Sequence, residues 1–131
     1  MKHDLNLTKM ILQTLSEYDS YCVPLTYLAQ KVQNQIGETE LFNDKFVGHF
    51  FLAKDTHLIE ELGVCFFTGQ SYKKPVVANN AKVRITAQGL EFLDALKNDN
   101  IVRQIKDFSF STAIDVGKSL LTKYISLQLG L

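Results

Sequence analysis

Apolar positions recur at helical spacing in three successive segments at the start of the chain. The first stripe follows Asp4, a suitable N-cap, and consists of Leu7, Met10, Ile11, Leu15 and Tyr18. The second ends at Gly37, a natural helix stop, and consists of Leu25, Leu28, Ala29, Val32 and Ile36. The third follows Asn43, another suitable N-cap, and consists of Phe46, Phe50, Ala53 and Leu58. The pattern predicts three N-terminal helices, the third ending near Thr56.

The middle of the chain changes to a strand pattern. Residues 64–68 form a short apolar run that is rich in strand-forming residues. In residues 82–85, Val83 and Ile85 share one face of a predicted strand, and Lys82 and Arg84 share the other. The intervening residues contain glycine, proline and asparagine, which favour a loop. Two strands joined by a long loop, after three helices, predict the wing of a winged helix.

Helical spacing returns after Thr86, which is a suitable N-cap, and continues through Leu90, Leu93, Leu96 and Ile101, with a candidate interruption at residues 98–100. A last amphipathic helix is predicted over residues 111–131, starting near Ser111 or Thr112, where Thr112 and Asp115 have the spacing of a capping box. We therefore predict one α+β winged-helix domain over residues 1–131. It would have three N-terminal helices, a two- to three-stranded wing and two or three C-terminal helices.

Composition limits the functions that this domain suggests. The 131 residues include 14 basic and 14 acidic side chains, so the molecule lacks the basic excess of many nucleic-acid-binding proteins. The first residues lead into an amphipathic segment rather than a signal peptide, which predicts a cytoplasmic location without a membrane partner. Cys22 and Cys65 lack the CxxC spacing of a metal or redox site and are predicted to be buried thiols.

Local charge, in contrast, is strongly polarised. Residues 64–86 contain four cations and no acid, a net charge of +4, whereas residues 38–61 contain two lysines and six acids, a net charge of −4. This difference favours phosphate contact by the wing over base contact by the third helix. Tyr72 could stack on a base or pack under the loop. The candidate DNA-contacting residues are Tyr72, Lys73, Lys74, Lys82 and Arg84. The alternative is that these cations keep a solvated edge soluble.

Other residue patterns do not indicate catalysis. Phe42, Phe46, Phe50 and Phe51 resemble an aromatic platform, but their near-helical spacing favours burial in a core. His49 and His57 are eight residues apart and lack a third ligand at a useful spacing, so no metal site is expected. Because no nucleophile elbow, phosphate loop or paired-carboxylate motif is present, we expect no catalytic residues, no cofactor and no enzymatic activity.

The last helix carries more apolar surface than a peripheral terminal helix needs. It either completes the core, the favoured interpretation, or joins two chains in a homodimer, and a helix lying on a membrane is the third choice. The candidate interface residues are Leu121, Tyr124 and Ile125.

Residues 49–59, 84–94 and 98–101 also resemble a family of uncharacterised winged-helix proteins from bacteria and prophages, catalogued as a domain of unknown function. The resemblance covers nearly the whole chain and implies the winged-helix fold without implying any chemistry. The family usually ends its third helix with a small residue and a glycine, where this chain has Thr56 and His57. His57 must therefore take a left-handed conformation, or the helix must end differently. This chain has Ala87 and Leu90 at the two positions where the family typically has tryptophan and histidine.

Two functional hypotheses follow from these observations. The first is a non-enzymatic DNA-binding or regulatory protein of bacterial or prophage origin that contacts double-stranded DNA mainly through its wing. The second is a protein interaction module or inhibitor that acts through the third-helix region or the C-terminal helix.

Overall fold

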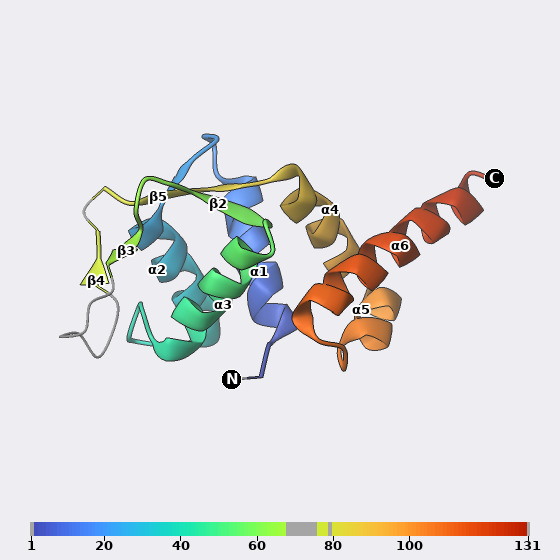
Figure 1. The fold of residues 1–131 in the computed structure, drawn as a ribbon, viewed down its shortest axis with the longest axis horizontal. Helices are drawn as coiled ribbons and strands as arrows, with labels where there is room; N and C mark the ends of the chain where they lie inside the picture. Colours follow the sequence, from blue (N-terminus) through green and yellow to red (C-terminus); the bar gives the residue numbers. More distant parts are fainter. Residues whose placement is uncertain (1, 68–75, 79, 131) are drawn as a thin grey trace.

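The computed structural model describes residues 2–67, 76–78 and 80–130 of the chain. These residues form an α+β fold with six helices and two small antiparallel sheets (Figure 1). In chain order, the elements are α1 (Leu5–Glu17), β1 (Val23–Pro24), α2 (Leu25–Ile36), α3 (Asp44–Asp55), β2 (Ile59–Leu62), β3 (Phe66–Phe67), β4 (Val76–Val77), β5 (Lys82–Ile85), α4 (Ala87–Leu96), α5 (Asp99–Ile105) and α6 (Phe110–Gln128).

The predicted ends of the first three helices are confirmed. The Asp4 carboxylate accepts hydrogen bonds from the first backbone N–H groups of α1, and the Asn43 side chain accepts one from Phe46 at 2.8 Å. Gly37 ends α2 with a φ of 73°. At the end of α3, His57 takes a φ of 63°, so it occupies the left-handed conformation itself.

The strand that pairs with β5 in the wing was predicted wrongly. In the three-stranded sheet, β5 lies between β1 and β2, and Glu60 of β2 pairs in register with Arg84 of β5. Residues 66–67 form β3 in a separate small sheet with β4. The sequence of β2 does not alternate like a half-buried strand. Its extended state follows from tertiary pairing, because the turn at His57 leads directly into it.

A close approach of two backbones fixes the junction between β2 and α4. Thr86 caps α4 as predicted, since its hydroxyl accepts a hydrogen bond from the N–H of Gly89 at 3.0 Å. A Cβ atom on Gly89 would lie only 2.1 Å from the carbonyl oxygen of Leu58. Glycine is therefore the residue that lets α4 pack this closely against the entry to β2.

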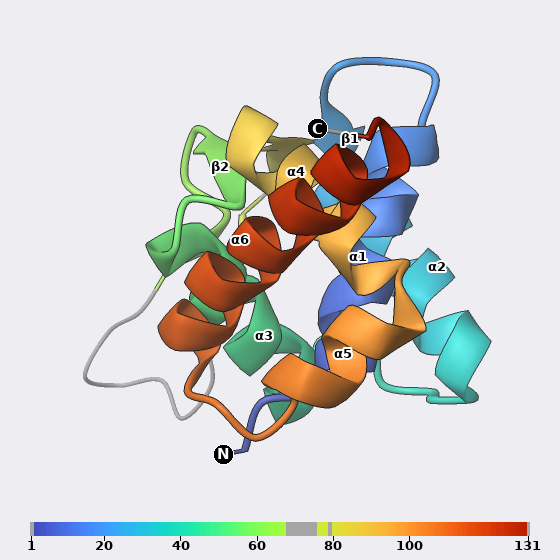
Figure 2. The same ribbon diagram turned by 90° about the vertical axis from the view of Figure 1, so that its right-hand side faces the viewer.

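The final helix begins one residue earlier than predicted, and its capping box is not formed. Ser109 is the N-cap residue, and its hydroxyl donates to the Thr112 hydroxyl at 2.9 Å. This start places Phe110 in the core, where its ring contacts the ring of Phe92. Figures 1 and 2 show that α6 lies against α4 and α5 in its first turns and then extends beyond both.

Candidate interaction surfaces

The wing residues divide between two parts of the chain. Tyr72, Lys73 and Lys74 lie outside the described residues. Lys82 is exposed and forms no ion pair with a described residue. The guanidinium of Arg84, in contrast, lies 2.6 Å from the Glu60 carboxylate on the neighbouring strand. The prediction of an acid-free hairpin is therefore wrong, because the true partner strand, β2, contributes glutamates.

Both lysines of α3 also form ion pairs. The Lys45 ammonium lies 3.0 Å from the Asp4 carboxylate, and Lys54 forms an ion pair with Glu61. Burial raises the pKa of Glu61, but hydrogen bonds from Lys54 and from a backbone N–H outweigh this effect, and the net result is a lowered pKa. The hydrogen bond to Glu61 raises the pKa of Lys54. We call Lys45, Lys54 and Arg84 the paired cations.

The aromatic side chains of α3, together with Phe42 just before the helix, belong to the core, as their spacing predicted. Phe46 and Phe50 are fully buried, and Phe42 and Phe51 are half-buried. The rings of Phe42, Phe50 and Phe51 all contact the ring of Phe66 from β3. This cluster ties α3 to the smaller sheet, so its faces are occupied by other rings.

His49 is a buried histidine with both ring nitrogens bonded. Its Nε2 accepts a hydrogen bond from the N–H of Asp4 at 2.7 Å, and its Nδ1 donates to the carbonyl of Lys45 at 2.7 Å. Burial lowers the pKa of His49 and outweighs the hydrogen bond to Lys45 and the charge of Asp4, which raise it. The neutral ring thus joins the start of α1 to α3. Among the described residues, no three metal-binding side chains are grouped.

The two cysteines differ in burial. Cys65 is buried as predicted, and its backbone N–H donates to the Glu61 carboxylate at 2.7 Å. Burial, followed by the nearby charge of Glu61, raises the pKa of the Cys65 thiol to about 12. It is therefore protonated and unreactive near neutral pH. Cys22 is only half-buried, so the prediction of two buried thiols holds for one of them.

The two halves of α6 have different surroundings. Ala113, Ile114 and Gly117 in its first half are buried against α4 and α5. In the second half, Ile125 is 47% exposed and Leu127 is 65% exposed. We call residues 120–128 the free half of α6. The predicted interface residues Leu121, Tyr124 and Ile125 all lie in it, the first two half-buried.

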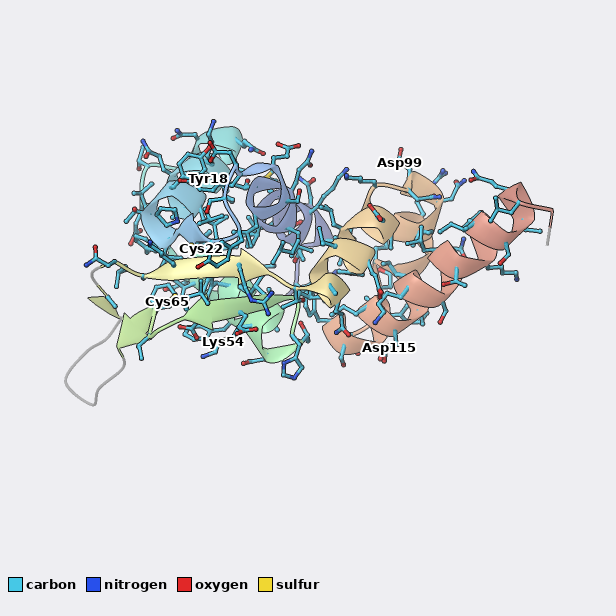
Figure 3. All side chains as sticks on the ribbon, turned by 90° about the horizontal axis from the view of Figure 1, so that it is seen from above. Tyr18, Cys22, Lys54, Cys65, Asp99 and Asp115 are labelled. Atoms are coloured by element: carbon cyan, nitrogen blue, oxygen red, sulfur yellow. The ribbon has the colours of Figure 1, made fainter. Side chains whose placement is uncertain are left out.

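A groove of about 590 Å³ runs between α4 and α6, beside the free half. Its polar edge is acidic, with Glu91 and Asp94 from α4 and Asp115 from α6; its apolar wall includes Leu121 and Ile125. Lys118 is the one cation in the lining, and its ammonium lies 3.7 Å from the Glu91 carboxylate. Figure 3 shows Asp115 on the first part of α6, before the helix extends past its neighbours.

The pattern of apolar residues predicted neither this groove nor the place of Leu120 and Leu127 in a second hollow. That hollow, of about 180 Å³, lies between α5 and α6 and is lined by Gln104, Leu120, Lys123, Tyr124 and Leu127. The sequence does contain a pattern that predicts one face of a helix here. Spacings of four and three residues alternate along Ala113, Gly117, Leu120, Tyr124 and Leu127. The spacing does not show how much of this helix face is buried, because that depends on where α5 lies against α6.

Comparisons with known proteins found no relative of this chain. No protein-family model, curated protein or solved structure matches this chain. The resemblance to uncharacterised winged-helix proteins therefore stays a prediction. Within the described residues, no helix has the length and apolar character needed to cross a membrane.

Proposed function

We propose that this chain is a non-enzymatic winged-helix protein that acts by binding another protein through the free half of α6. The observation that carries the proposal is the exposure of Ile125 and Leu127, at 47% and 65%, on a helix whose first half is core. Large apolar side chains left exposed along one helix segment favour a binding site over a solvated end.

The order of elements supports the winged-helix part of the proposal. Helices α2 and α3 follow each other as a helix-turn-helix pair, and β2 and β5 form the base of a hairpin beside α3. In this arrangement α3 is the helix that would enter a DNA groove. The fold alone does not assign a partner, so the surfaces must do so.

The surface around α3 favours a protein partner over base recognition. All three paired cations already have a carboxylate within the protein, and Asp44 and Asp55 are exposed at the two ends of α3. A cation gains less from a phosphate when it must first leave a carboxylate, and exposed acids repel the DNA backbone. The geometry of α3 therefore opposes close approach to a duplex.

The buried chemical groups support a non-enzymatic role. Both nitrogens of His49 are occupied by backbone partners, and the Cys65 thiol has a pKa raised to about 12. A general base or a nucleophile needs a free lone pair directed at a substrate. These two groups instead stabilise the fold.

Site-specific photo-crosslinking tests this proposal in the cells that make the protein. A benzoylphenylalanine at position 127 should form a covalent adduct with another protein. The control is the same group at position 106, where Lys106 is exposed in the linker between α5 and α6, and no adduct is expected there. Mass spectrometry would identify the adduct. Equal labelling from both positions, or none from position 127, would contradict the proposal.

A second candidate function is contact between double-stranded DNA and the wing, and the exposure of Lys82 favours it. This side chain lies at the start of β5, and Lys73 and Lys74 precede it in the sequence. Binding would weaken steeply with salt, because it would rest on phosphate contacts. The test is titration with duplex DNA at low and moderate salt.

Two variants sharpen that titration. Replacing Lys73, Lys74 and Lys82 together by alanine should abolish binding, whereas Glu60→Gln should strengthen it by releasing Arg84 from its ion pair. Absence of binding by the wild-type protein at low salt would remove this candidate.

A further inference from the structure

We infer that His3 and Asp4 form a pH-sensitive link between α3 and the start of α6, and that this link opens when the His49 ring takes up a proton. We call these two residues the N-terminal link. The inference is separate from the proposed function, because it concerns how the chain holds its own helices together. Figure 2 shows the N-terminal residues beside α3 and the loop that joins α5 to α6.

The first argument is that the N-terminal link has a partner on each side. The backbone N–H of Asp4 donates to Nε2 of His49 on α3 at 2.7 Å. On the other side, Nε2 of His3 lies 2.6 Å from the carbonyl oxygen of Phe108, in the connection between α5 and α6. The His3 ring also packs edge-on against the ring of Phe110, the first residue of α6. Two adjacent residues therefore hold α3 and the start of α6 together.

The second argument is the polarity of the hydrogen bond to His49. A backbone N–H can only donate, so Nε2 of His49 must present a lone pair to Asp4. Nδ1 of the same ring already donates to the carbonyl of Lys45 at 2.7 Å. A proton on Nε2 would therefore place two donors against each other. Because His49 is fully buried, water cannot solvate the added charge while the link stays closed.

The charged groups around His49 determine the direction of the effect. Burial is the largest influence and lowers the pKa of His49; the hydrogen bond to the Lys45 carbonyl and the Asp4 carboxylate raise it, and the Lys45 ammonium and the His3 ring lower it. Burial raises the pKa of Asp4, but hydrogen bonds from Lys45 and from backbone N–H groups outweigh it, so Asp4 stays ionised near neutral pH. Since the pKa of His49 is lowered while the link is closed, a falling pH favours the open form.

The third argument is that the link can open while the rest of the fold persists. Protonation of His49 removes the bond of the Asp4 backbone N–H, whereas the Asp4 carboxylate keeps its own bonds to the first N–H groups of α1. Helix α1 therefore retains its cap. Phe110 is 7% exposed and also contacts Phe92, so loss of the His3 ring would uncover one edge of it. The opening is thus a local change at the start of α6.

Amide hydrogen exchange followed by NMR tests the inference on the full chain. Between about pH 7.5 and about pH 5.5, the protection factor of the Asp4 amide should fall about five- to tenfold, because an open form with an ordinary histidine gains at most about tenfold at one unit below its pKa. Low urea concentrations should not change this exchange at about pH 5.5, since a local opening exposes little surface. The nuclear Overhauser contact between the rings of His3 and Phe110 should weaken over the same pH range.

Three results would overturn the inference. The first is an Asp4 protection factor that stays constant within about twofold. The second is exchange at Asp4 that accelerates with urea as steeply as the slowest core amides, because the loss would then be global unfolding. The third is a contact between His3 and Phe110 that persists while Asp4 loses protection.

Variants assign the effect to His49. In His49→Gln, which cannot titrate, both pH-dependent changes should disappear. Asp4→Asn keeps a good N-cap residue but removes a charge that raises the pKa of His49, so the opening should move to lower pH. The control is His57→Asn at the other end of α3, because His57 is exposed and asparagine tolerates its left-handed conformation. A pH dependence that persists in His49→Gln, or that is lost in His57→Asn, would overturn the inference.

Discussion

The paired cations and the free half of α6 differ in how far the protein satisfies its own side chains. Lys45, Lys54 and Arg84 each have a carboxylate partner elsewhere in the chain. Ile125 and Leu127 of the free half, 47% and 65% exposed, have no comparable cover from the described residues. The cations are satisfied within one chain, and these apolar side chains are not.

This difference shows why the position of a charge matters more than its count. A net charge of +4 over residues 64–86 favours DNA, but the strand that pairs with β5 adds Glu60 directly opposite Arg84. Where α6 extends beyond α5, the exposed Ile125 and Leu127 have no described residues packed over them in the way that Glu60 neutralises Arg84. The unsatisfied surface is therefore the better guide to a partner.

The largest effect is expected at Gly89, at the junction that joins the sheet to the C-terminal helices. Gly89→Ala should lower the free energy of unfolding by about 3 kcal/mol, because its Cβ would meet the Leu58 backbone at 2.1 Å. Gly117→Ala is the control: its Cβ would meet movable ring and methyl atoms at 3.2 and 3.3 Å and should cost about 1 kcal/mol. Urea unfolding followed by circular dichroism measures both. Similar losses would contradict the assigned backbone contact.

A smaller but more direct contrast is expected between the two halves of α6. Ile114→Ala, in the buried half, should cost about 2 to 3 kcal/mol through lost burial and a cavity. Leu127→Ala, in the free half, should change the stability by less than about 0.5 kcal/mol. Thermal unfolding at low protein concentration provides the measurement. A large loss for Leu127→Ala would mean that this half is already covered.

The next effect comes from pH and concerns the buried His49, which joins the start of α1 to α3. Because the pKa of His49 is lowered below 6.5 in the folded protein, the unfolded chain binds more protons below that pH. Stability should therefore be fully present above pH 6.5 and should fall as the pH decreases toward the lowered pKa. Urea unfolding at about pH 7.5 and about pH 5.5 measures the loss.

The matched variant for this pH test is His49→Gln, which retains a polar side chain but cannot titrate. It should be less stable at neutral pH and should show a shallower decrease on acidification. An unchanged pH dependence would show that another group, such as Asp4, causes it.

The smallest effect is expected from the ion pair between Glu60 and Arg84. A double-mutant cycle with alanine at both positions should give a coupling energy of about 0.5 kcal/mol, because both side chains are partly exposed. Added salt should reduce the coupling further. A coupling energy well above 1 kcal/mol would mean that the pair organises the sheet rather than merely neutralising its surface.

The helix caps and the buried faces could be predicted because they depend on local chemistry. Asp4, Asn43 and Thr86 cap the helices that their positions predicted. The strand Ile59–Leu62 could not be predicted, because its extended state depends on pairing with the distant strand Lys82–Ile85. Its acidic residues are also what changed the interpretation of Arg84.

The candidate site was predictable only in part. Leu121, Tyr124 and Ile125 were singled out by apolar spacing, but spacing alone cannot distinguish a core helix from an interface helix. That distinction depends on where α4 and α5 end along α6 (Figure 1). Lys73 and Lys74 remain predictions of the sequence.

Hydrogen–deuterium exchange, with and without the protein that crosslinks to position 127, tests the central claim most directly. We expect backbone amides of residues 120–128 to exchange more slowly when that protein is bound, while amides of α3 do not change. Leu127→Glu should remove this protection. Exchange in the free half that is the same with and without the bound protein would contradict the claim that the free half is a binding surface.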